Sequence, residues 1–133
     1  MTDNSEILIR NCLLKSGKSL DSSQILIENK DVDAAFNRIY YSIFYSVMAL
    51  GYKYGFITSK HRQLMGWFNK KFINEDKVFT SRMYQIYKTA YDNRQDSGYN
   101  LILISNKKME EVEEALKDAE YFVKQVTEFL GIA

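Results

Sequence analysis

The densest group of hydrogen-bonding side chains in this chain is the segment Asp-Asn-Arg-Gln-Asp-Ser at residues 92–97. Arg94 suits a phosphate, because a guanidinium offers several donors in a planar fork. We expect a ligand site here, with Arg94, Asp96 and Asn100 as candidate binding residues and Tyr99 as a candidate reactive group, although a phenol is a poor base at neutral pH. Alternatively, Arg94 offsets the charge of a helix C-terminus or pairs with a nearby aspartate.

A second arginine lies within an aromatic-rich stretch, Ala-Phe-Asn-Arg-Ile-Tyr-Tyr-Ser-Ile-Phe-Tyr at residues 35–45. Here Arg38 is a candidate phosphate or partner contact in the same cleft as Arg94, with Tyr41 as a further binding residue. The structural alternative pairs Arg38 with a carboxylate or with backbone carbonyls at a helix end. In the same view, Tyr40 and Tyr41 pack with their hydroxyls satisfied.

RNA cleavage without a metal ion needs a base for the 2′-hydroxyl proton and cations or donors that hold the phosphate oxygens. His61 is the only histidine and therefore the candidate base. It is far from Arg94 in sequence, so it can act there only if the folded bundle or a dimer brings the two together. Otherwise it is a surface histidine or a satisfied core histidine.

A local basic segment surrounds and follows His61. Its cations are Lys60, Arg62, Lys70, Lys71 and Lys77. Trp67 and Phe68 lie between them, and we expect these two rings in the core. The cations either form a patch that faces RNA or an ordinary solvated face, balanced by the acidic face of the last helix.

Composition limits the classes of function. The net charge is +1, so nucleic acid would bind to a local patch and not to a global field. Cys12 is the only cysteine, which excludes an internal disulfide and a sulfur-rich zinc site; we expect it on a helix as a small apolar residue. The polar start lacks the features of a signal peptide, and no segment reaches the length of a membrane span. We expect a cytoplasmic protein without a metal or cofactor.

Apolar residues repeat at helical spacing along most of the chain, which contains no proline. We expect helices over residues 5–29, from Asp31 or Asp33 to about 54, from Thr58 or Ser59 to about 72, over 80–95 and over 109–130. Gly55 and Gly131 are expected stops. Residues 96–104 should be irregular, with 101–104 as a buried connector. Five segments with short turns predict an all-α, up-and-down four-helix bundle with an additional short helix, in one domain over residues 1–133.

Several segments resemble the HEPN domain family of small all-helical proteins. Residues 35–44 match the family pattern A-x-x-R-x-Y-Y-x-x-F, and residues 94–99 resemble its R-x-x-A-D-Y element. His61 falls where the family often has a histidine in the third helix. The toxin-type ribonucleases of the family carry a histidine four to six residues after the arginine, whereas Gly98, Tyr99 and Asn100 occupy those positions here.

The resemblance implies an RNA- or nucleotide-binding protein of a toxin–antitoxin or defence module, paired with a minimal nucleotidyltransferase. It implies a homodimer with the Arg94 segments at its cleft, weak or absent ribonuclease activity, and Tyr99 as the position that a partner would modify with AMP. Two alternatives remain open. One is a non-enzymatic adaptor that binds a partner protein through its bundle surface. The other is an enzyme that uses His61 with Arg94 across a dimer interface.

Overall fold

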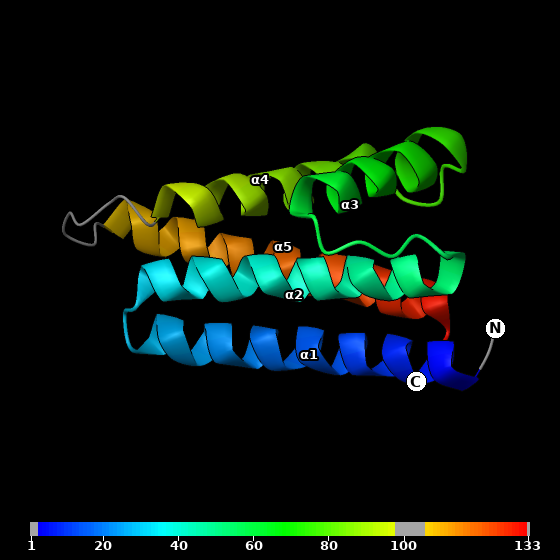
Figure 1. Ribbon diagram of the computed structural model, residues 1–133. Helices are drawn as coiled ribbons and strands as arrows, with labels where there is room; N and C mark the ends of the chain where they lie inside the picture. Colours follow the sequence, from blue (N-terminus) through cyan, green and yellow to red (C-terminus); the bar gives the residue numbers. More distant parts are fainter. Residues whose placement is uncertain (1–2, 98–105, 133) are drawn as a thin grey trace.

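The computed structural model describes residues 3–97 and 106–132, and every element in these ranges is a helix (Figure 1). In chain order the elements are α1 (Asp3–Glu28), α2 (Val32–Tyr54), α3 (His61–Phe68), the π-helix η1 (Asn69–Glu75), α4 (Ser81–Ser97) and α5 (Asn106–Leu130). The four long helices run alternately up and down, and α3 with η1 packs beside α2 and α4. The predicted all-α bundle is confirmed. The expected connector at 101–104 lies outside the described residues.

Helix α2 is the centre of the bundle and packs against α1, α3, α4 and α5. Five of its side chains, spaced three and four residues apart, are buried along one face: Phe36, Tyr40, Ile43, Val47 and Leu50. The predicted ends are also observed. The Asp31 side chain accepts a hydrogen bond from the amide of Ala34, and Gly55 ends the helix with φ +79°, a conformation that glycine adopts without strain.

Serines allow α1 and α2 to approach closely. Ser16, Ser19 and Ser23 of α1 are buried, as are Ser42 and Ser46 of α2. The Ser16 hydroxyl donates to the backbone carbonyl of Ser42 at 2.6 Å, across the interface between the two helices. Gly17 does not interrupt α1, and open space surrounds its missing Cβ. These small side chains therefore let the two helices pack with their backbones close together.

After Gly55 the chain turns back along α2 and delivers the start of α3 to the middle of that helix (Figure 1). We call residues 55–60 the strap. The Phe56 amide donates to the Gly51 carbonyl at 2.9 Å, and a Cβ on Gly51 would collide with the Phe56 carbonyl. The expected cap of α3 is wrong: Lys60 is the N-cap residue, and the Thr58 hydroxyl binds the Lys60 amide and the Gln63 side chain instead.

The third helix also differs from the single α-helix expected to about residue 72. It changes to π-helical turns at Asn69 and continues to Glu75. In this register the Asp76 amide donates to Lys71, which leaves the Phe72 carbonyl to accept from Val78 and Phe79 as the chain turns into α4. The expected end of α4 at residue 95 is likewise too early, because the helix includes Ser97.

Phe72 is fully buried at the centre of a set of aromatic rings, which lies at the C-terminal end of α2, where Tyr54 contacts it. We call this set the Phe72 cluster. It comprises Phe72 with Tyr54, Trp67, Phe68, Phe79 and Phe129, whose ring centroids lie 5.4–5.9 Å from that of Phe72. Phe122 of α5 adjoins it through Phe68. These contacts join α2, α3, η1 and α5 into one core.

Candidate functional site

The strap and α2 bring a histidine to a buried tyrosine. Tyr40 has no exposed surface, and its hydroxyl lies 2.6 Å from Nδ1 of His61, the first residue of α3. The imidazole stacks on Phe44, with centroids 4.4 Å apart and planes 9° apart. Tyr40 and Phe44 face His61 together because residues four apart lie on one side of a helix.

Three arginines surround these rings. The guanidinium of Arg94, in the last turn of α4, lies 4.8 Å over the centre of the Tyr40 ring and 5.5 Å over that of Tyr91. Arg62 Nε donates to the Tyr91 hydroxyl at 3.1 Å. The remaining arginine, Arg38, lies 4.9 Å over the Tyr41 ring, which is itself 5.3 Å from that of Tyr40.

We call this group the Tyr40 site. Its members are Arg38, Tyr40, Tyr41, Phe44, His61, Arg62, Tyr91 and Arg94. They come from α2, the first turn of α3 and the C-terminal half of α4, so only the tertiary fold assembles them.

Burial and positive charge set the protonation of the two central groups. Burial, and then the charge of Arg94, lower the pKa of His61 below its ordinary 6.5. Burial raises the pKa of Tyr40 well above that of a free phenol, and the charge of Arg94 only partly opposes it. At neutral pH the site therefore holds an uncharged imidazole, a protonated phenol and three cationic guanidiniums.

Four of the predicted catalytic or binding residues meet here: Arg38, Tyr41, His61 and Arg94. His61 and Arg94 meet on Tyr40 within one chain, without a second copy. Asp96 lies in the last turn of α4, but its side chain is outside the described part, as are Tyr99 and Asn100.

Two side chains near the arginines have specific partners. Within the described residues, Arg38 donates to the Asn37 side-chain oxygen at 2.9 Å through Nη2, and not to a carboxylate or a backbone carbonyl. Asp92, one of the two aspartates near Arg94, binds Lys88 at 2.8 Å, and the side chain of the other, Asp96, is outside the described part. The lysine lies one helical turn earlier on the same face, where it reaches the carboxylate directly.

Sequence reasoning missed three contributions to the site. Tyr91 is a buried ring whose hydroxyl accepts from Arg62, and Arg62 was expected only on a basic face. Phe44 is the surface on which His61 stacks. The four-residue spacing of Tyr40 and Phe44 was the available signal, but nothing in the sequence showed that α3 would start opposite them.

The sequence matches the HEPN domain family over residues 9–129, which is most of its length. The chain belongs to the HEPN domain family. The resemblance seen in residues 35–44 and 94–99 is thereby confirmed at the level of the family.

Two relatives are similar to this HEPN protein. A "UPF0332 protein" of Thermotoga maritima is 28% identical over 116 residues, which cover 87% of this chain and 86% of the relative. The protein named "Putative toxin MJ0142" of Methanocaldococcus jannaschii is 31% identical over 116 residues, which cover 87% of this chain and 77% of the relative. The relationship to a toxin-type HEPN protein rests on the second match.

Residues 3–97 and 106–132 of this HEPN protein contain neither a candidate membrane-spanning helix nor a candidate metal-binding cluster. None of the helices there has both the length and the apolar character needed to cross a bilayer. The same residues contain no group of three or more histidine, cysteine, aspartate or glutamate side chains placed to hold a metal ion.

Proposed function

We propose that this HEPN protein binds RNA, or a nucleotide, at the Tyr40 site, with weak or no ribonuclease activity, as part of a toxin–antitoxin or defence module. The observation that carries this proposal is the meeting of His61 and Arg94 on Tyr40, flanked by Arg38 and Arg62. The printed name of the archaeal relative supports the toxin assignment.

The arginines favour a phosphate ligand. The Asn37 amide that binds Arg38 and the Tyr91 phenol that binds Arg62 are both uncharged, so these contacts leave the positive charges uncompensated. The Tyr40 and Tyr41 rings support the flat faces of the Arg94 and Arg38 guanidiniums, and the edge of Arg38 keeps donors beyond those that bind Asn37. A phosphodiester is the ligand whose charge and bidentate geometry match such donors.

The hydrogen bond between Tyr40 and His61 argues for binding over cleavage. Because burial keeps the Tyr40 phenol protonated, we assign its hydroxyl as the donor to Nδ1, and in this tautomer the neutral imidazole carries its proton on Nε2. That nitrogen can donate to a phosphate oxygen but cannot accept the 2′-hydroxyl proton. His61 thus acts as a further phosphate donor, and a step that needs a general base is slow.

Binding to fluorescein-labelled RNA, followed by fluorescence anisotropy, tests the proposal. Arg94→Ala should weaken binding about 10- to 100-fold, because it removes a charged donor. The matched control is Arg10→Ala, since Arg10 lies on α1 and pairs with Glu6 on an exposed face. Equal affinities of wild type, Arg94→Ala and Arg10→Ala would reject the Tyr40 site as the RNA site.

Cleavage is tested separately by incubating the protein with tRNA and mRNA and resolving the products on denaturing gels. We expect little or no product while the RNA is bound. Rapid cleavage that disappears in His61→Ala would contradict the tautomer assigned to His61 and would make the protein a ribonuclease.

The homodimer and the nucleotidyltransferase partner belong to the same proposal. Light scattering after size exclusion measures the first, and co-purification with a nucleotidyltransferase encoded beside this gene measures the second. A monomer at all concentrations, or no association with that neighbour, would remove the corresponding part without affecting RNA binding.

A second candidate function, a non-enzymatic adaptor, is favoured by exposed apolar side chains on the outer face of α1. Ile7, Leu14 and Ile25 are each more than half exposed, at 56%, 58% and 57%. Ile7→Ser and Ile25→Ser together should abolish capture of a protein partner if this function holds, and should leave RNA affinity unchanged, because neither residue lines the groove between α1 and α2.

A further inference from the structure

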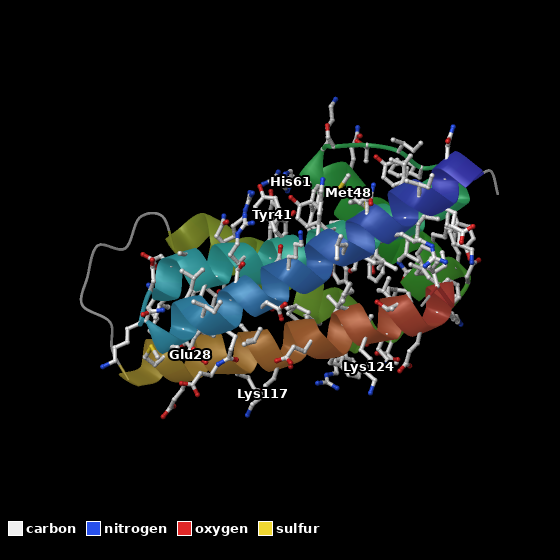
Figure 2. The ribbon with its side chains drawn as sticks, turned by 90° about the horizontal axis from the view of Figure 1, so that it is seen from below. Glu28, Tyr41, Met48, His61, Lys117 and Lys124 are labelled. Carbon is white, nitrogen blue, oxygen red and sulfur yellow. The ribbon has the colours of Figure 1, made fainter. Side chains whose placement is uncertain are left out.

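Helix α2 carries a stripe of half-buried side chains that the core does not use fully. It comprises Arg38, Tyr41, Tyr45, Met48 and Tyr52, at steps of three and four residues along one face of the helix. The stripe begins inside the Tyr40 site, because the Tyr41 ring lies 5.9 Å from His61 and 5.8 Å from Tyr45. Figure 2 shows Tyr41, His61 and Met48 close together on one side of the bundle, away from Lys117 and Lys124 of α5.

Helix α1 supplies one wall beside the stripe. A groove of about 270 Å³ lies between the two helices, where Lys15 and Lys18 of α1 face Tyr45, Met48 and Tyr52 of α2. Lys15 Nζ lies 5.6 Å over the centre of the Tyr45 ring. None of the side chains that line this groove is a carboxylate.

The groove between α1 and α5 is different. It is larger, about 500 Å³, and its lining includes Glu28, Glu113 and Glu120 beside Lys30 and Lys117. Mixed charges of this kind do not attract a polyanion, whereas a groove whose only charged side chains are lysines does. A further groove between α1 and α5, of about 380 Å³, has Arg10 as its only charged lining residue but no aromatic ring. Lysines together with tyrosines therefore distinguish the α1–α2 groove as the one suited to nucleic acid.

We infer that the α1–α2 groove is a track for single-stranded RNA that leads away from the Tyr40 site. Bases stack on Tyr41, Tyr45 and Tyr52, while Lys15 and Lys18 hold the phosphates. This inference rests on the proposed function and extends it by naming the form of the RNA and its path. We call these five residues the tyrosine track.

Geometry and chemistry both favour a single strand. Tyr41 and Tyr52 are eleven residues apart, which corresponds to about 16 Å along the helix and to several nucleotides. Tyrosine rings beside cations are the usual platforms for unpaired bases, which expose their faces, whereas a duplex keeps its base faces stacked inside.

The experiment compares RNA length. Anisotropy titrations would use fluorescein-labelled oligouridylates of about 4 and about 12 nucleotides at one salt concentration. Wild type should bind the long strand much more tightly, because only that strand reaches the track. Lys15→Ala, Tyr45→Leu and Tyr52→Leu should each weaken binding of the long strand about fivefold to tenfold and leave the short strand unaffected.

Lys124→Ala and Tyr121→Leu are the matched controls, because both residues lie on α5 away from the track. They should change neither affinity. If wild type binds neither strand, the proposed function fails. If it binds both strands equally, or the track variants bind like the controls, the RNA site stands and the track is wrong.

A change of oligomeric state is a separate outcome, measured by light scattering on the same variants. If Tyr45→Leu and Tyr52→Leu dissociate a dimer and preserve the preference for the long strand, the groove is an interface between copies. That result also overturns the track.

Discussion

Tyr40 and Phe72 have the same degree of burial but very different surroundings. Each is fully buried, and each is enclosed by other rings. Around Tyr40 the neighbours bring a hydroxyl, an imidazole and guanidiniums, whereas phenylalanines dominate around Phe72.

One cation beside the Phe72 cluster differs from two arginines of the Tyr40 site in its partner. Lys71 lies 5.0 Å over Tyr54 beside the Phe72 cluster, but its charge is paired with Asp76 at 3.2 Å. Arg38 and Arg62 in the Tyr40 site bind uncharged groups instead. In the Phe72 cluster the aromatic residues thus serve packing. In the Tyr40 site they lie beside arginines whose charges are not neutralised by the uncharged groups that they bind. The following predictions separate these two roles.

The largest expected effect is on the Phe72 cluster. Phe72→Ala should lower the free energy of unfolding by about 3–5 kcal/mol, because it leaves a cavity among rings that are already closely packed. Chemical denaturation measures this loss. RNA affinity per folded molecule should not change, and a selective loss of affinity would show that the two regions are coupled.

A smaller loss is expected where the strap crosses α2. Gly51→Ala should lower the free energy of unfolding by about 1–3 kcal/mol, because the new methyl group meets the Phe56 carbonyl. Unlike Phe72→Ala, it should also displace His61 and so weaken RNA binding. Gly66→Ala, at an exposed position with open space around it, is the control and should be neutral or stabilising.

Removing single hydroxyls should have opposite effects at two neighbouring tyrosines. Tyr40→Phe should cost about 1 kcal/mol and raise the pKa of His61, because the donor that favours the neutral imidazole is lost. Tyr87→Phe should be neutral or stabilising, since its buried hydroxyl has no partner among the described residues. Denaturation and a proton NMR titration of His61 measure both effects. A fall in the pKa of His61 would reverse the assigned direction of the hydrogen bond.

The smallest effect concerns pH. Because the folded pKa of His61 is lowered, the unfolded chain binds a proton first as the pH falls below about 6.5, and stability declines from that point. His61→Gln should flatten this part of the profile, as no other histidine is present. Stability that rises as the pH falls from 6.5 would contradict the lowered pKa.

Local patterns were sufficient for the bundle and for most of its core. The helical spacing of α2 and α5 fixes which side chains point inward, and Asp31 and Gly55 mark helix ends through interactions within a few residues. The π-helical turns were not predictable from spacing, because they depend on how the Phe72 carbonyl meets the chain that follows.

The candidate site was only partly predictable. Family patterns identified Arg38 and Arg94 separately, but the meeting of His61 with Tyr40 depends on the path of the strap, which turns on a backbone contact at Gly51. No pattern of side chains encodes that path. For the same reason, nothing in the sequence indicated that His61 and Arg94, which are 33 residues apart, would both lie against the Tyr40 ring.

The serine contact between α1 and α2 has a consequence for the groove above it. The hydrogen bond from the Ser16 hydroxyl to the Ser42 carbonyl fixes the position of α1 along the axis of α2, independently of larger side chains. Sliding by a single turn, about 5.4 Å, would break that bond and carry Lys15 past Tyr45. The smallest residues of the interface therefore determine which cation stands above which ring.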